Sequence, residues 1–130
     1  MAAAIVLPDE PEPSSSIQQH MFAGPLIAPA HWPVEIGNSL LQAIRRGRPS
    51  LDATPAAIAR LTALRVSISA PREPLVRTND IVFAQGHGLT LYDAAYLLLA
   101  SDHGAALASN DRDLIRAARA LGVPVLTSLA

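Results

Sequence analysis

Short apolar runs alternate with longer stretches of helical spacing along this chain of 130 residues. The longer stretches predict helices, which begin after polar or proline residues and end near glycine: Pro33–Arg46, Ala56–Leu64, Leu75–Gln85, Thr90–Ala100 and Asp111–Leu121. The short runs predict strands at Leu26–Ala28, Val66–Ser69, Ala105–Ala108 and Val123–Leu126. Helices that alternate with short apolar strands favour a single α/β domain, in which a parallel sheet carries helices on both faces.

The N-terminal region is harder to interpret. Leu7–Ser16 is a loop rich in proline and serine, and its serine run can cap a short helix that ends at Phe22. Before it, Ala2–Val6 is an apolar stub, too short to assign by itself.

Composition excludes several classes of protein. Half of the residues are hydrophobic and 16% are charged, which rules out wholesale disorder. The absence of cysteine excludes disulfides and thiolate metal sites, and it permits a reducing cytoplasm, where we expect this protein. The longest apolar stretch, Leu91–Ala100, carries Asp93 and is far too short for a membrane span, so we expect no membrane association. The net charge of −1 means that any RNA binding needs a local basic patch or metal ions.

Three carboxylates follow predicted strands or begin predicted helices. Glu35 lies in the first turn of the helix after Leu26–Ala28, Asp93 begins the helix at Thr90, and Asp111 follows Ala105–Ala108. In open parallel sheets, sites form beyond the carboxyl ends of the strands. Carboxylates that converge there repel one another, and a divalent cation such as Mg²⁺ relieves the repulsion.

Helix capping offers an alternative role for each of them. Thr90 and Asp93 have capping-box spacing, as do Asn110 and Asp113, and Asp111 could interact with a helix dipole. Glu35 could be an ordinary first-turn glutamate. Taken singly, acidic caps are commoner than metal ligands. Asp93 fits a cap least well, because it is the only charge in a helix that is apolar nearly all round and therefore mostly buried.

Other signals are weaker. The four histidines show no metal-ligand spacing, and the chain has no Gly-rich phosphate loop, G-x-S-x-G or H-E-x-x-H motif. Arg45-Arg46-Gly47-Arg48 is a basic helix end that suits either the helix dipole or phosphate contact.

Two segments resemble PIN-domain ribonucleases, specifically the VapC-like toxins of type II toxin–antitoxin systems. Gly88–Val125 contains Leu-Thr-x-Tyr-Asp-Ala-x-Tyr, then a strand followed by Ser-x-Asp, then Leu-x-x-Ala-Ala-x-x-x-Gly-Val. Ala28–Arg48 fits the family's second motif, with Glu35 followed by Gly37, Asn38 and Leu40. The resemblance covers nearly the whole chain.

The resemblance implies a metal site and an activity. Glu35, Asp93 and Asp111 would be the metal-binding and catalytic carboxylates, Ser109 would be the helper hydroxyl, and Asp113 is a weaker extra ligand. Family members use Mg²⁺ or Mn²⁺ to hydrolyse RNA, often a tRNA or ribosomal RNA, are held silent by a cognate antitoxin, and commonly dimerise. The implied mechanism is attack on phosphorus by a metal-activated water.

The resemblance also predicts a defect at the front of the chain. Family members begin with a strand at the middle of the sheet that ends in a metal-binding aspartate. That aspartate would precede Met1, so Ala2–Val6 would belong to the next helix, while Asp9 and Glu10 match a loop after it. We therefore expect residues 1–130 to form one N-terminally truncated domain, a PIN-like three-layer α/β/α fold with a central parallel sheet whose first strand is missing. The alternative is that Ala2–Leu7 pairs as a substitute strand without supplying the ligand.

Three hypotheses follow for the function. The first is a metal-dependent endoribonuclease toxin that acts on RNA, with an antitoxin partner and a homodimeric state. The second is a catalytically inactive PIN-like module that binds antitoxin or RNA but does not cut. The third is a structural domain in which the carboxylates only cap helices.

Overall fold

A five-stranded parallel sheet forms the centre of the protein. The computed structural model describes residues 3–5, 25–47 and 51–127. The strands are β1 (Ala3–Ile5), β2 (Leu26–Ala28), β3 (Ser67–Ile68), β4 (Ala106–Ala108) and β5 (Val125–Leu126). Their order across the sheet is β3-β2-β1-β4-β5, and every neighbouring pair is parallel.

The expectation of a missing first strand is wrong. Ala3–Ile5 occupies the middle of the sheet, where Ala3 is in register with Leu26 of β2 on one side and with Ala106 of β4 on the other. The stub does not belong to a helix, because the strands on both sides supply backbone hydrogen-bond partners that outweigh the poor strand propensity of alanine. The pairing alternative therefore holds for these residues. The predicted loop over Leu7–Ser16, with Asp9 and Glu10, and the short helix to Phe22 lie outside the described residues.

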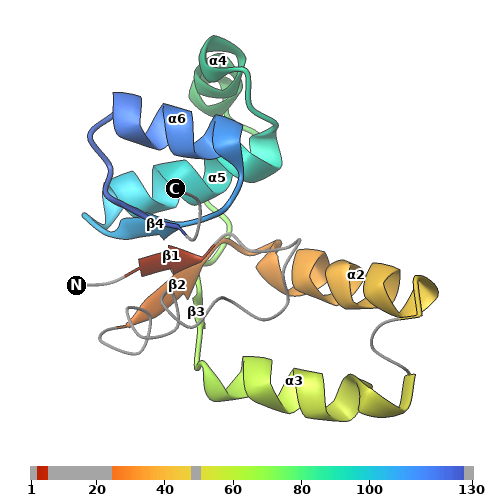
Figure 1. Cartoon of the computed structure of the whole chain (residues 1–130). Helices are drawn as coiled ribbons and strands as arrows, with labels where there is room; N and C mark the ends of the chain where they lie inside the picture. The colour runs from red at the N-terminus through yellow and green to blue at the C-terminus, as the bar shows by residue number, and fades with distance from the viewer. Residues whose placement is uncertain (1–2, 6–24, 48–50, 128–130) are drawn as a thin grey trace.

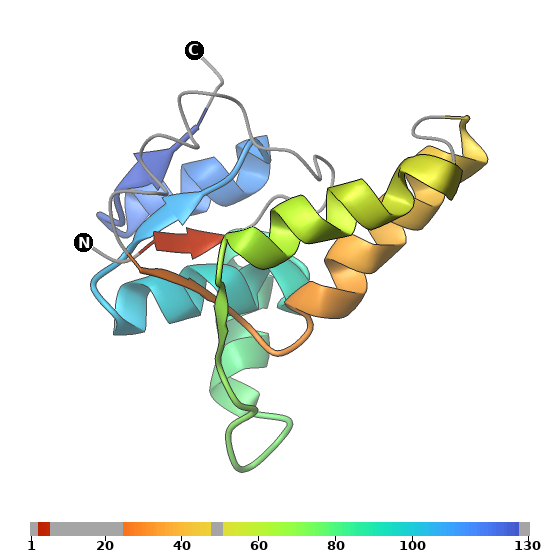
Figure 2. The same cartoon turned by 90° about the horizontal axis from the view of Figure 1, so that it is seen from below.

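Helices cover both faces of the sheet. They are α2 (Trp32–Arg45), α3 (Thr54–Ala63), α4 (Thr78–His87), α5 (Leu91–Asp102) and α6 (Arg112–Ala120), and a 3₁₀ turn, η1, precedes α3 at Leu51–Ala53. Right-handed crossovers in this strand order place α2 and α3 on one face and α4, α5 and α6 on the other. Figure 1 shows the latter three grouped together, and in Figure 2 α2 and α3 run side by side beyond the sheet. No helix in the described ranges is long and apolar enough to cross a membrane.

Most predicted elements are confirmed to within two residues at each end. The exception is the helix predicted over Leu75–Gln85, which begins three residues later, at Thr78, and continues to His87. Arg77 has extended backbone angles, so the chain enters the helix only after it. Gly86 does not stop this helix. Gly88 does so, with a left-handed φ of 65° that glycine adopts without strain.

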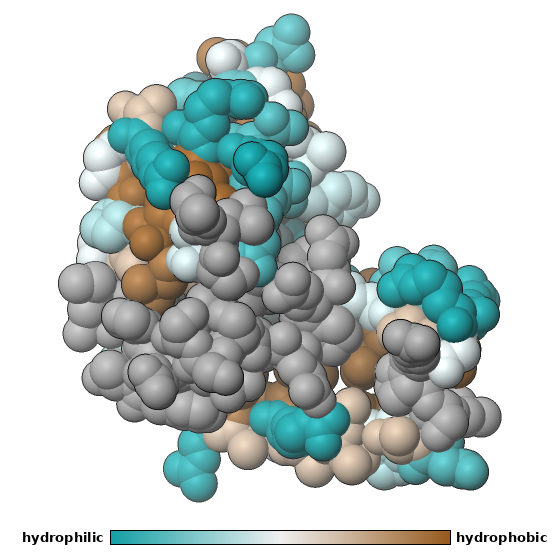
Figure 3. All heavy atoms as spheres, viewed as in Figure 1, coloured by the Kyte–Doolittle hydropathy of each residue, from teal (hydrophilic) through white to brown (hydrophobic). Residues whose placement is uncertain are grey.

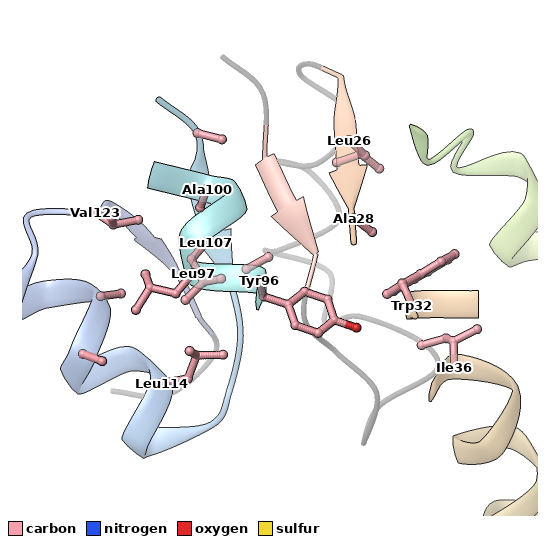
Figure 4. Close-up of a cluster of buried hydrophobic side chains, with 14 residues drawn as sticks. Leu26, Ala28, Trp32, Ile36, Tyr96, Leu97, Ala100, Leu107, Leu114 and Val123 are labelled. Carbon is pink, nitrogen blue, oxygen red and sulfur yellow. The ribbon is translucent and has the colours of Figure 1, made fainter. Parts of the chain in front are cut away.

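The core is aliphatic and lies mainly between the sheet and α5 and α6. Leu97, Leu107 and Leu114 are fully buried where these elements meet, as Figure 4 shows. All three residues of β4 are buried, as expected for an inner strand with helices on both faces. Tyr96, also fully buried, extends from α5 toward Trp32 and Ile36 of α2 and so connects the two helix layers (Figure 4).

This core predicts the effect of truncating Leu97. Leu97→Ala leaves a cavity at a fully buried position, so we expect the free energy of unfolding to fall by about 2–5 kcal/mol. Urea denaturation measures the change. Leu121→Ala, the same substitution at a 44% exposed position after α6, is the matched control and should cost less than about 1 kcal/mol. Equal losses in the two variants would contradict this packing.

Candidate functional site

The candidate site lies at the carboxyl edge of the sheet, on both sides of β1. β2 ends at Ala28, and the chain turns directly into α2, whose first turn contains Glu35. β4 ends at Ala108, and the next three residues are Ser109, Asn110 and Asp111. Because β2 and β4 are both parallel neighbours of β1, these two turns emerge at the same edge of the sheet.

Glu35 is held by a side chain from the opposite helix layer. The Tyr96 hydroxyl donates a hydrogen bond to Glu35 Oε1 at 2.8 Å. His31 Nε2 lies 2.8 Å from the same oxygen, although the contact lacks hydrogen-bond geometry. The His31 ring packs edge-on against Tyr96, with ring centroids 5.1 Å apart, and also against Tyr92. Both contacts use Oε1, so among the described residues no partner occupies Oε2.

Burial and two carboxylates disfavour ionisation of the Tyr96 phenol. Burial is the main cause that raises the pKa of the Tyr96 phenol far above its usual value. The hydrogen bond to Glu35 raises the pKa further, and so do the negative charges of Glu35 and Asp93. Glu35 of α2 is hydrogen-bonded to this hydroxyl, and the charge of Asp93, at the start of α5, acts on it as well.

Asp93 also belongs to the cap of its helix. The Thr90 hydroxyl accepts a hydrogen bond from the Asp93 backbone N–H at 3.1 Å, which confirms the Thr90-x-x-Asp93 capping spacing. This bond uses the backbone N–H of Asp93 rather than its carboxylate. The side chain is half-buried, at the start of a helix whose remaining residues are mostly inside the protein.

Asp111, rather than Asn110, caps α6. Asp111 Oδ1 accepts the Leu114 N–H at 2.9 Å. Asn110 Oδ1 instead accepts a hydrogen bond from the Thr127 hydroxyl at 2.9 Å, so the expected Asn110-x-x-Asp113 cap is wrong by one residue. Asp113 is exposed and pairs with Arg116 at 3.1 Å.

Ser109 fixes the turn that carries Asp111. Its side chain is completely buried, and its hydroxyl accepts the Asp111 N–H at 3.0 Å. Its own backbone N–H donates to Leu126 of β5 at 3.1 Å. The serine therefore ties Asp111 to the end of the sheet.

The carboxylates are not assembled into one tight cluster. In the described part of the chain, no group of three or more acidic or histidine side chains has a spacing that could hold a metal ion. Glu35 is hydrogen-bonded to Tyr96, which follows Asp93 by three residues in α5, whereas Asp111 lies on the other side of β1, at the start of α6. The three candidate ligands are carboxylates, which suit a hard cation. A protein donor already holds one oxygen of Glu35 and one oxygen of Asp111.

Sequence reasoning missed Tyr96 and His31. Tyr96 lies 61 residues from Glu35 along the chain, so no local pattern pairs the two. A weak signal did exist, because His31 precedes Glu35 by four residues and Tyr96 follows Asp93 by three. These spacings place the side chains of each pair on one side of a helical turn.

Comparison with solved structures shows the fold. The chain matches the crystal structure of PAE2754 from Pyrobaculum aerophilum with a TM-score of 0.67 and 20% sequence identity, over 96% of this chain and 89% of that one. It also matches SSO1118, a PilT N-terminus domain protein from the archaeon Sulfolobus solfataricus P2, with a TM-score of 0.48 and 19% identity, over 98% and 87% of the two chains. The chain therefore shares its α/β/α architecture with PAE2754, and β1 lies at the middle of the sheet.

Sequence comparisons add no assignment. No protein-family model matches the chain, and neither does any curated protein. At 20% identity the structural likeness concerns the fold, so the function has to be argued from the site.

The raised pKa of Tyr96 predicts a loss of stability in alkali. Above about pH 10 tyrosine ionises in the unfolded chain, while Tyr96 stays protonated in the folded one, so the free energy of unfolding should fall as the pH rises. The chain has no lysine or cysteine and only two tyrosines, so few other groups titrate in this range. Urea denaturation between about pH 9 and 11.5 should show the fall in Tyr92→Phe, where Tyr96 is the only tyrosine. The fall should disappear in the Tyr92→Phe/Tyr96→Phe double variant; identical slopes would contradict the assignment.

Proposed function

We propose that this protein is a divalent-cation-dependent endoribonuclease of the VapC-like toxin type, with Glu35, Asp93 and Asp111 as its metal-binding carboxylates. The observation that carries the proposal is the hydrogen bond from the buried Tyr96 hydroxyl to Glu35, which joins the first turn of α2 to the helix that begins near Asp93, at the carboxyl edge of a parallel sheet. Asp111 follows β4, the other neighbour of β1, at the same edge. Two acidic residues from separate layers would repel each other there, and a cation such as Mg²⁺ or Mn²⁺ offsets that repulsion.

Each residue has a separate role in this proposal. Tyr96 donates to Oε1 of Glu35 and so directs Oε2 toward a ligand. The Ser109 hydroxyl accepts a hydrogen bond from the Asp111 N–H. Asp111 Oδ1 caps α6, and Asp111 Oδ2 would face the metal. Asp113 would act only as an outer acidic group, because it is exposed and paired with Arg116. When bound, Mg²⁺ or Mn²⁺ supplies an activated water and neutralises charge on the phosphodiester.

Cleavage of a mixed tRNA pool tests the proposal. We expect Mg²⁺- or Mn²⁺-dependent cleavage by the full chain, reduced at least about a hundredfold in Asp93→Asn, because one anionic ligand is lost. Asp52→Asn, an exposed acidic residue near α3, is the matched control and should cleave as the wild type does.

Thermal unfolding of the same variants gives a second readout. Mn²⁺ should raise the melting temperature of the wild type and of Asp52→Asn, and should raise that of Asp93→Asn much less. If the metal leaves all three melting temperatures unchanged, the carboxylates only cap helices, as in the third hypothesis. A folded chain that binds Mn²⁺ but cleaves no RNA would contradict the ribonuclease and favour the PIN-like binding module.

The proposal includes a cognate antitoxin, for which the groove between α2 and α3 is the best surface. The groove has a volume of about 550 Å³ and is mostly apolar, with Ile36, Leu40, Ile58 and Leu61 among its lining residues. In Figure 3, apolar side chains are visible between the two helices at the lower right. A groove of this kind accepts the apolar face of a helix from a partner protein.

A homodimer is also part of the proposal, through an exposed apolar patch of Leu75, Val76, Ile81 and Leu91. These side chains surround one pocket between α4 and the start of α5, and all four are at least 47% exposed. Contiguous apolar surface of this kind marks a protein interface more often than scattered leucines do. A second copy of the chain would bury it.

Analytical ultracentrifugation tests the dimer. Ile81→Asp places a charge in the patch and should convert the dimer to a monomer, because an unpaired buried carboxylate is costly at an interface. Val34→Asp on α2 is the control: Val34 is 77% exposed and lies outside the patch. A wild-type chain that sediments as a monomer at high micromolar concentration would contradict the proposal.

A further inference from the structure

Another pocket adjoins the candidate site on the side of His31. It has a volume of about 250 Å³ and lies between the turn after β2, the segment after β3, the first turn of α4 and one side of α5. Pro29, Ala95, Leu98 and Leu99 give it apolar walls. An apolar pocket with a few polar groups at defined places is the usual form of a small-ligand site.

Three polar side chains of this pocket lack partners among the described residues. Arg77 and Asp80, at the start of α4, are both half-buried and line the pocket. Among the described residues, neither side chain forms a hydrogen bond or an ion pair. Ser69 contributes a half-buried hydroxyl that is likewise without a partner there. Arg72, at the rim, is instead paired with Asp102. Partly buried charges without partners cost stability, and a bound ligand that pairs with them removes this cost.

The pocket is continuous with the proposed cleavage site. His31 lines the pocket, and its Nε2 lies 2.8 Å from Glu35 Oε1. A nucleotide whose phosphate approaches Glu35 could therefore place its base in the pocket. The pocket adjoins the dimer patch, because Leu75, Arg77 and Asp80 also line the pocket between α4 and α5. Its opposite wall, with Pro29, His31 and Ser69, is separate from that patch and faces the candidate site.

We propose that this pocket binds a guanine base of the RNA strand, next to the bond that is cut; the proposal rests on the ribonuclease function above. Guanine presents the acceptors O6 and N7 on one edge, which match an arginine, and an N2 amino donor on another. Its N1–H lies beside that amino group, so a carboxylate can accept both hydrogen bonds. Arg77 and Asp80 supply one group of each kind in a single pocket. The apolar walls contact the faces of the base.

Mononucleotide binding by the full chain tests the inference without metal and without cleavage. In calorimetric titrations with EDTA present, GMP should bind at least about tenfold more tightly than AMP, CMP and UMP, since they share its ribose phosphate but not its hydrogen-bonding edges. Inosine monophosphate, which differs from GMP only by the missing N2 amino group, should bind more weakly than GMP.

Two variants separate base recognition from general binding. Asp80→Asn should lose the preference for GMP over AMP, whereas Asp52→Asn, an exposed acid away from the pocket, should keep it. Equal affinity for the four nucleotides, or a preference that survives in Asp80→Asn, would overturn the inference. If Asp80→Asn does not fold, the comparison of GMP with inosine monophosphate on the wild type decides instead. Selective GMP binding by a chain that cleaves no RNA would contradict the ribonuclease proposal alone, while RNA cleavage without GMP selectivity would contradict the pocket alone.

Discussion

The hydrogen bond from the Tyr96 hydroxyl to Glu35 Oε1 joins the two helix layers at the site. Tyr96 is completely buried, and a buried phenol has to find a hydrogen-bond partner. Its partner here is a carboxylate on the opposite face of the sheet, 2.8 Å away. The start of α2 is therefore fixed relative to α5 across the end of the central strand. The orientation of the Glu35 carboxylate depends on this one bond.

Capping and metal binding are compatible roles for these carboxylates. A carboxylate has two oxygens and about four acceptor positions. Asp111 uses Oδ1 to cap α6, and the Thr90 cap engages the backbone N–H of Asp93 rather than its side chain. In Asp111 the helix cap therefore fixes the orientation of the carboxylate. Structural and functional interpretations of the same sequence motif therefore need not exclude each other.

Local pattern was enough to predict most helices, four of the strands and the helix starts that carry Glu35 and Asp93. It failed where distant partners decide the structure. Ala3–Ile5 has little strand propensity, and only pairing with β2 and β4, from 23 and 103 positions further along the chain, makes it the central strand. Tyr96 belonged to a recognised motif, yet its contact with Glu35 spans 61 residues, and the local spacing gave only a weak signal that did not pair the two. The start of α4 was misplaced because Leu75 and Val76 resemble helix residues but precede the extended Arg77.

The most direct test of the central claim is an anomalous difference map from crystals of the full chain grown with Mn²⁺. The account predicts a peak within about 2.0–2.3 Å of carboxylate oxygens of Glu35 and Asp93, with Asp111 as a direct ligand or one joined through water. It also predicts that Glu35 Oε1 keeps its bond to Tyr96 while Oε2 faces the ion. Saturating Mn²⁺ with no peak at these carboxylates, or with Tyr96 turned away from Glu35, would contradict the account.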